Sequence, residues 1–231
     1  MLVSQATDGA ARDQMMRRLR TAVQNPLLAA DRRTALPPMP AVDAPAAEER
    51  LAIWRREFEA LAGHVHGPWA PATARDQMVA LLRARAVRRI LAWDDAALPV
   101  PDLHQHLAAA GIAAVTHSPD WTTRALADAD EFTAGVTGTL AGLADTGSIL
   151  VVSGPGRLRS ASLVPPVLYA FLRVGDIYPD LAGWLQDADR MLRAAANIVV
   201  ITGPSRTADI ELNLVIGVHG PGEIHVVLVD R

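Results

Sequence analysis

The densest group of polar side chains in this 231-residue sequence lies in the segment Gly203-Pro-Ser-Arg-Thr-Ala-Asp-Ile-Glu211. It directly follows an apolar run, and loops at strand ends are where α/β proteins usually keep their function. Arginine binds a carboxylate or a phosphate in a two-point fork, so Arg206 is the expected anchor for a small anion. Ser205 and Thr207 flank it as hydrogen-bond donors, and Gly203 opens the same loop. The segment therefore predicts an anion-binding site.

Proton chemistry at this site would use the acidic groups of the segment and a nearby histidine. His219 stands in a glycine-rich turn at a strand end, so it is the predicted acid or base, with Asp209 and Glu211 as the other catalytic candidates. Ser205, His219 and Asp209 also suggest a nucleophile, base and orienter, but no Gly-x-Ser-x-Gly elbow surrounds the serine. A structural alternative pairs Arg206 with Asp209 or Glu211 at a helix start, and this pairing is compatible with ligand binding.

A second polar loop precedes the strand-like run 149–152. Thr146 and Ser148 supply two hydroxyl groups, and Gly147 between them lets the backbone amide approach a ligand. The alternative is an Asx-type turn that only connects two elements. We include Thr146, Gly147 and Ser148 in the predicted binding site.

A third loop follows the same run. Gly154, Arg157 and Ser160 form an anion-friendly segment, and we add them to the predicted site. A dinucleotide fingerprint would need glycine where Arg159 stands, so a nicotinamide cofactor is not indicated. The alternative is a solvated, positively charged surface loop.

Three further histidines give no predicted metal site. His64 and His66 have no third ligand nearby in sequence, and a solvated loop pair is the preferred interpretation over a metal site. His225 stands inside an apolar run and is interpreted as a core histidine.

Composition removes several kinds of chemistry. The chain has no cysteine, which excludes thiol nucleophiles, cysteine-ligated zinc and iron–sulfur clusters held by this chain alone. It has no lysine, which excludes a Schiff base and a Walker-A lysine. A net charge of −3 does not indicate a nucleic-acid or membrane surface, and no apolar run is long enough to span a bilayer. We expect a cytoplasmic protein.

The pattern of apolar residues predicts an N-terminal helix and proline-rich arm over residues 1–45, and a single α/β domain over residues 46–231. The domain is predicted to be a Rossmann-like three-layer sheet, mostly parallel, with N-terminal helices and a C-terminal antiparallel hairpin of 214–218 and 224–229 joined by a short glycine-rich turn. Helices are expected at 9–23, 48–61, 71–85, 101–110 and 180–196. Strands are expected at 89–93, 112–116, 132–136, 148–153, 167–174, 197–201, 214–218 and 224–229.

The polar loops together resemble the LUD-domain family, and within it the lactate utilisation protein C (LutC-like) members. The resemblance rests on Asp145-Thr-Gly-Ser-Ile-Leu, Gly154-Pro-Gly-Arg, Ser162-Leu-Val-Pro, the 203–211 segment and Gly217-Val-His-Gly-Pro221. It implies a fold similar to the NagB/RpiA/CoA-transferase type. It also implies a part in oxidising L-lactate to pyruvate beside iron–sulfur partner proteins.

The residues qualify what this resemblance implies. Oxidising a 2-hydroxy acid requires an electron carrier, and this sequence offers neither cysteine nor a dinucleotide motif. We expect no cofactor in this chain and iron–sulfur clusters on its partners. The expected function is an accessory or substrate-handling subunit that binds a small carboxylate or phosphate, and whether it is itself an enzyme stays open.

Two alternatives come from other classes of protein. One is a stand-alone enzyme on a phosphorylated or CoA-linked small molecule, for which Glu211 and Glu131 are the candidate nucleophiles. The other is a non-catalytic scaffold whose polar loops bind partner proteins. No nucleic-acid or membrane partner is expected, and association of identical subunits stays open.

Overall fold

The computed structural model describes residues 6–23, 45–116, 132–188, 195–208, 214–216 and 220–230. The chain divides into two units, residues 1–42 and 43–231, and the predicted boundary between arm and domain at residue 45 stays a prediction. In the first unit the described element is helix α1 (Ala6–Val23), whose side chains from 12 to 21 are exposed. No helix in the described ranges is long and apolar enough to cross a membrane.

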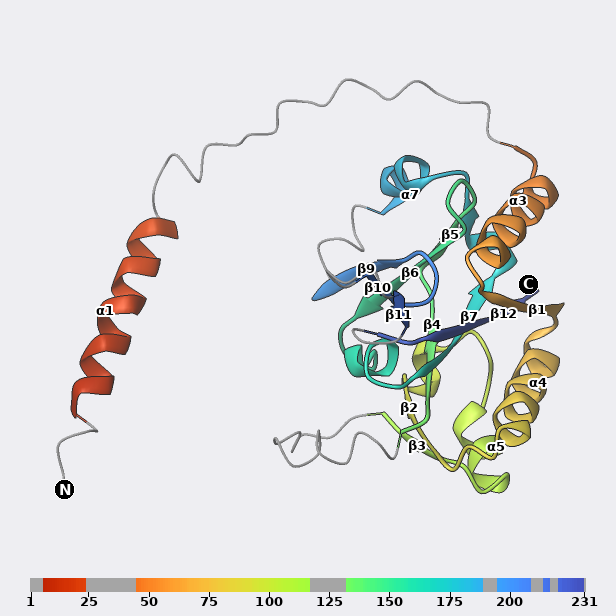
Figure 1. Cartoon of the computed structure of the whole chain (residues 1–231), viewed down its shortest axis with the longest axis horizontal. Coiled ribbons are helices and arrows are strands. Elements are labelled where there is room, and N and C mark those ends of the chain that lie inside the picture. Colours follow the sequence, from red (N-terminus) through yellow and green to blue (C-terminus); the bar gives the residue numbers. More distant parts are fainter. Residues whose placement is uncertain are drawn as a thin grey trace. The chain divides into compact units, whose positions relative to one another are not determined.

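The second unit is built on a six-stranded sheet in which every neighbouring pair of strands is parallel (Figure 1). Buried residues fill its central strands on both faces, as expected of a sheet covered on both sides. In spatial order the strands are β1 (His64–Trp69), β12 (Glu223–Val229), β7 (Val167–Arg173), β4 (Ala134–Gly138), β2 (Arg89–Ala92) and β3 (Ala113–Val115).

Two helices, α4 (Pro71–Ala84) and α5 (Leu103–Ala109), cover one face of this sheet (Figure 1). α4 packs on β1 and β12 through Ala74, Met78 and Leu82, which recur at helical spacing and are fully buried.

A second, four-stranded sheet stands against the other face. Its strands, in spatial order, are β8 (Ile177–Tyr178), β5 (Ala141–Leu143), β6 (Ser148–Ser153) and β9 (Asn197–Ile201). Helix α7 (Leu181–Asp187) packs Trp184 on this sheet, and its N-cap Asp180 accepts a hydrogen bond from the Gly183 amide at 2.7 Å. A two-stranded ribbon, β10 (Arg206–Ala208) and β11 (Leu214–Ile216), completes the described strands.

Helix α3 (Ala47–Ala60) joins the two sheets. Trp54 and Phe58 are fully buried and stacked at 5.0 Å between ring centroids, and the Trp54 indole donates to the Ser148 carbonyl at 3.0 Å. Short 3-10 turns fill the remaining corners: η1 (Asp95–Ala97), η3 (Arg159–Ser162) and η4 (Val174–Asp176).

The predicted mixed α/β fold with a mostly parallel sheet is confirmed, but the predicted C-terminal hairpin is wrong. β11 pairs antiparallel with β10, whereas β12 lies between β1 and β7 and is parallel to both. The reason is that β12 is apolar on both faces, with all residues from Ile224 to Val229 buried. A strand of this kind belongs inside a covered sheet and not at an exposed edge.

β1 is a strand that the sequence pattern does not predict. Its residues were predicted as a solvated loop because His64-Val-His-Gly-Pro-Trp69 is polar and contains glycine and proline. β1 is the edge strand beside β12, and an edge is where a strand tolerates proline.

Candidate anion site

A cavity of about 280 Å³ opens at the carboxyl ends of β2, β4 and β7. The connection from β2 runs outward to β3, and the chain then returns to β4 on the other side of β2, so the strand order reverses between β2 and β4. Crevices beyond the carboxyl ends of strands at such a reversal are the usual ligand sites of open parallel sheets. We name this cavity the carboxyl-edge pocket.

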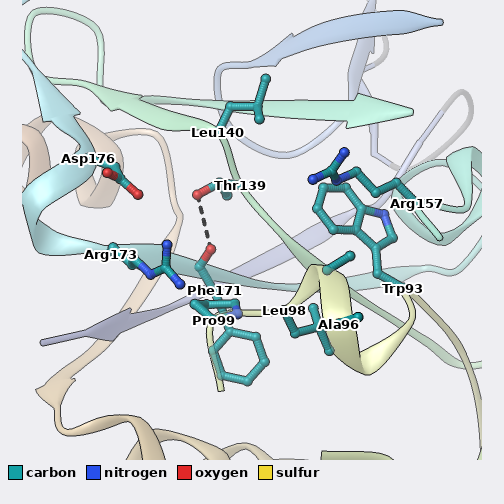
Figure 2. Close-up of a pocket in the computed structure, with 11 residues that line it drawn as sticks. Trp93, Ala96, Leu98, Pro99, Thr139, Leu140, Arg157, Phe171, Arg173 and Asp176 are labelled. Atoms are coloured by element: carbon teal, nitrogen blue, oxygen red, sulfur yellow. Dashed lines mark hydrogen bonds between the residues drawn. The ribbon is translucent and has the colours of Figure 1, made fainter. Parts of the chain in front are cut away.

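The pocket combines an apolar wall with charged groups on two sides (Figure 2). Phe171, Leu98 and Leu140 contribute to the wall, and the Thr139 hydroxyl donates to the Phe171 carbonyl at 3.0 Å. The lining residues are Trp93, Ala96, Ala97, Leu98, Pro99, Thr139, Leu140, Arg157, Phe171, Arg173 and Asp176.

On one side of the pocket Arg157 lies beside Trp93, with its Cζ atom 5.8 Å from the indole ring centroid (Figure 2). The Trp93 Nε1 and Arg157 Nε groups are both buried, and neither has a hydrogen-bond partner in the described part of the chain. A buried donor without an acceptor costs about 1–3 kcal/mol. Both residues line the carboxyl-edge pocket, which makes its wall a candidate site for a ligand that brings acceptor atoms.

On the other side lie Arg173, at the end of β7, and Asp176 in η4 (Figure 2). Burial raises the pKa of the Asp176 carboxyl above its ordinary value, and the nearby Arg173 opposes this shift. A carboxyl group with a raised pKa in a cavity is a candidate for holding or moving a proton.

A second cavity of about 570 Å³ shares Arg157 with the carboxyl-edge pocket. Its lining includes Gly154, which forms an antiparallel bridge with Arg157, and Asp94, whose amide donates to the Gly156 carbonyl at 2.9 Å. The loop after β6 is therefore held in place by backbone contacts, and these contacts position Arg157 between the two cavities.

The predicted residues Thr146 and Ser148 lie elsewhere, in a chain of three hydroxyl groups. The Ser148 Oγ atom is 2.8 Å from Thr146 Oγ1 and 2.8 Å from Thr202 Oγ1, and the Ser148 side chain is buried. This chain ties the β5–β6 turn to the end of β9. Thr202 was not singled out in the sequence.

Gly147 and Gly203 have structural reasons for their identity. Both have positive φ, +64° and +93°, which side-chain-bearing residues rarely adopt. A Cβ atom on Gly147 would lie 2.4 Å from the Phe58 amide nitrogen, and one on Gly203 would lie 3.1 Å from the Leu61 Cβ atom. Both glycines thus let turns pack closely on the end of α3.

The predicted binding residues are not all brought together. Ser148 begins β6 and Gly154 follows its end, and the strand between them is about 17 Å long at 3.3 Å per residue. The Ser205 amide donates to the Pro221 carbonyl at 2.8 Å, and Thr202 bonds to Ser148, so these residues belong to the Ser148 end. One small anion cannot contact both ends of β6.

Several predicted residues stay untested. Arg206 and Thr207 form part of β10, paired with Ile216 and Val215, but their side chains lie outside the described residues. The predicted catalytic residues lie there entirely: His219, Asp209 and Glu211. Ser160 is in η3, and its buried hydroxyl has no partner among the described residues.

Sequence reasoning missed the four other pocket residues with polar side-chain groups: Trp93, Thr139, Arg173 and Asp176. A signal for three of them was available, because Trp93, Thr139 and Arg173 end or directly follow strands of the parallel sheet. Asp176 has no such signal, since its place depends on the turn η4.

The fold and the pocket define an α/β protein with a cavity at the carboxyl edge of its parallel sheet. The LUD domain matches residues 93–229, and the chain belongs to the LUD-domain family. The matched residues contain the carboxyl-edge pocket in full.

Relatives of known name support the predicted resemblance. The chain is 30% identical to Lactate utilization protein C of Halalkalibacterium halodurans over 158 residues, which make up 65% of this chain and 67% of that protein. It is 35% identical to Lactate utilization protein C of Macrococcus caseolyticus, over 44% of this chain and 46% of that protein. An uncharacterised protein of Neisseria meningitidis is 30% identical over 57% of this chain and 59% of its own length. The chain thus spans about half to two thirds of the curated relatives it matches.

A solved structure agrees on the fold. A DUF162 family protein from Deinococcus radiodurans superposes with a TM-score of 0.55 at 18% sequence identity, over 80% of this chain and 99% of that one. At this identity the similarity concerns the fold alone.

Proposed function

We propose that this chain is a LutC-like subunit of an L-lactate utilisation system and binds a small organic anion in the carboxyl-edge pocket. The observation that carries the proposal is the pair of buried donors, Trp93 Nε1 and Arg157 Nε, that find no acceptor among the described residues, in a cavity that Arg173 also lines. A carboxylate brings acceptor oxygens to such donors and is attracted by guanidinium groups.

The shape and lining of the pocket favour a short acid. The apolar side chains Leu98, Leu140 and Phe171 suit a methyl group. The Thr139 oxygen can accept from a substrate hydroxyl, since its own proton is donated to the Phe171 carbonyl, and the Asp176 carboxyl can donate to a keto oxygen when it is protonated. L-lactate and pyruvate are both of this kind. The volume of about 280 Å³ leaves room for either acid together with water.

The subunit would bind the substrate, and other proteins would carry the electrons that its oxidation releases. The chain has no cysteine, so iron–sulfur clusters for lactate oxidation would be carried by cytoplasmic partner proteins. Relatives named Lactate utilization protein C support this assignment to lactate utilisation.

Calorimetric titration with L-lactate, pyruvate and inorganic phosphate tests the binding site. Arg157→Gln should weaken binding of the preferred anion at least about tenfold, the equivalent of one lost charge-assisted contact of about 1.5–3 kcal/mol. Arg159→Gln is the matched control, because Arg159 is exposed in the same loop and its loss changes the net charge equally.

The same titration tests the anchor predicted from sequence. If Arg206→Ala abolishes binding and Arg157→Gln does not, the anion site lies at the Ser148 end of β6 and the pocket assignment is wrong. If none of the three anions binds the wild-type protein, anion binding itself is excluded.

Genetics tests the wider role. Deleting the gene should abolish growth on L-lactate as the carbon source, and the protein should co-purify with cysteine-rich partners. Normal growth on lactate after deletion would contradict the proposal. A CoA thioester trapped on a glutamate of this chain would favour the transferase alternative.

A further inference from the structure

A cluster of imidazole and carboxylate groups lies at the opposite end of the sheet, near the start of β12. β1 contributes His64 and His66, and β12 contributes Glu223 and His225. Their two strands are neighbours with His64 paired to His225 in register, so alternation places all four side chains on one face. Tyr169 on β7 is paired with His225 and joins the same face.

The rings in this cluster are stacked on His225. The centroid of its ring is 4.5 Å from that of His64, 5.2 Å from that of His66 and 4.7 Å from that of Tyr169, with interplanar angles below 20°. His225 is buried, whereas the His64 side chain is about half exposed. The cluster therefore reaches from the core to the surface.

The polar atoms converge on one point. His225 Nε2 is 2.6 Å from Glu223 Oε1, and His64 Nε2 is 3.7 Å from the same oxygen. One ligand atom from each of these three residues lies within 4.8 Å of the others. Around a tetrahedral zinc ion with bonds near 2.0–2.1 Å, neighbouring ligand atoms are about 3.3 Å apart. The observed separations bracket this value.

The second nitrogen of His225 is already held. His225 Nδ1 is 2.9 Å from His66 Nε2, which fixes the orientation of the buried ring. Histidines that bind metals in proteins nearly always have their other ring nitrogen bonded in this way. His66 is thus a positioning residue and not a fourth ligand.

A cavity adjoins the cluster. Arg85 and Tyr169 both line a space of about 400 Å³, and the buried Tyr169 hydroxyl has no hydrogen-bond partner among the described residues. Arg85 also pairs with both carboxylate oxygens of Glu223. The cavity offers room for water or a ligand, and Tyr169 offers it an unused donor.

From these observations, we infer that His64, Glu223 and His225 form a binding site for a divalent transition metal of the zinc class. Two imidazoles and one carboxylate suit Zn²⁺ or Co²⁺ and are unsuited to Mg²⁺ or Ca²⁺, which prefer oxygen ligands. Three protein ligands leave a fourth position for water or substrate. This site is independent of the anion pocket.

Titration with Co²⁺ and Zn²⁺ alone, on the full chain without a histidine tag, tests the inference. Wild-type protein should bind one equivalent and give the visible absorption bands of four-coordinate Co²⁺. His64→Ala and Glu223→Gln should each weaken binding about tenfold or more. His64 is about half exposed and Gln has the shape of Glu, so both variants should fold, which circular dichroism checks.

Two further variants sharpen the test. The double variant His104→Ala, His106→Ala is the control. It removes two histidines on α5 that are two residues apart, as His64 and His66 are, and it should leave metal binding unchanged. Arg85→Gln should tighten binding, because Glu223 loses the guanidinium that competes with the ion. Absence of stoichiometric binding by the wild-type chain, or binding that survives both ligand substitutions, would overturn the inference.

Discussion

The Arg157 guanidinium lies over the Trp93 indole, with 5.8 Å between Cζ and the ring centroid, and each side chain holds one buried N–H group that has no acceptor in the described ranges of the chain. The contact explains how a flexible arginine is held at the pocket wall. A cation over an aromatic face contributes about 0.5–2 kcal/mol and restricts the guanidinium to one position. The unsatisfied donors are the part of this arrangement that a ligand would complete.

The variant Trp93→Phe distinguishes the contribution of the indole N–H to anion binding from that of the aromatic ring. Phenylalanine keeps an aromatic face for Arg157 but removes the Nε1 donor, so affinity for the anion should fall about three- to thirtyfold, which corresponds to one hydrogen bond. The free energy of unfolding should change by less than about 1.5 kcal/mol, because losing an unsatisfied donor offsets part of the lost packing. Calorimetric titration and urea denaturation measure the two effects. Unchanged affinity would show that the indole N–H does not contact the ligand.

Ser148→Ala tests the hydroxyl chain at the other end of β6. Because Ser148 is buried and bonded to both Thr146 and Thr202, its loss should lower the free energy of unfolding by about 1–2 kcal/mol. Anion affinity should stay within about twofold of wild type, since the pocket lies beyond the far end of the strand. Denaturation and titration on the same variant give both values. A large loss of anion affinity with unchanged stability would show that Ser148 contacts the ligand, as the sequence predicts.

The sequence predicts the frame of this protein better than its site. Apolar runs identified β6 and β9 with their observed bounds, because the interior of each strand is a short continuous apolar segment. β1 was not predicted as a strand because its histidines, glycine and proline are typical of a loop. The predicted pairing of β12 with β11 was also wrong. The short separation of the two strands in sequence favours a hairpin, but burial of β12 on both faces decides its pairing with β1 and β7.

For the site, the sequence identified candidate polar residues but not which of them lie close together. Gly154 and Arg157 were predicted together and lie together, in one loop. Ser148 and Arg157 were predicted for one ligand but lie at opposite ends of β6, and the strand predicted over 148–153 already separates the two loops. The carboxyl ends of β2 and β7 supply Trp93 and Arg173 to the pocket, and this proximity arises only when the parallel sheet is assembled.

Two glycines predicted to approach a ligand should behave differently on substitution. Gly147→Ala should lower the free energy of unfolding by about 2–4 kcal/mol, because φ is positive and the new Cβ atom would meet the Phe58 backbone at 2.4 Å. Gly154→Ala is the control, since nothing lies within 4 Å of its Cβ position and its φ is not in the left-handed region. Urea denaturation should show a change below about 1 kcal/mol for Gly154→Ala. Equal effects at the two positions would refute the packing argument.

The burial of His225 and the pairing of Glu223 with Arg85 make stability depend on pH. Burial lowers the pKa of His225 to about 4 from 6.5, although Glu223 opposes the shift. Hydrogen bonding to Arg85 lowers the pKa of Glu223 to about 2 from 4.5. Between pH 6.5 and 4 the unfolded chain binds a proton at His225 that the folded chain does not, so stability is complete above this window and falls as the pH falls through it. Glu223 acts in the same direction between pH 4.5 and 2, more weakly because it is partly exposed.

Urea denaturation in the presence of a chelator measures this dependence without a metal contribution. From pH 7 to pH 4.5 the free energy of unfolding should fall on the order of 2 kcal/mol from His225, the size expected for a depressed pKa of a buried imidazole. His225→Phe keeps an aromatic ring between His64 and Tyr169 but cannot be protonated, so it should reduce the slope in that range. The slope that remains is expected from His66, whose pKa burial also lowers. His106→Phe on α5 should leave the slope as in wild type, because His106 lies outside the cluster. If His225→Phe keeps the full slope, the acid sensitivity arises from other groups and the His225 ring titrates in the folded protein as it does in the unfolded chain.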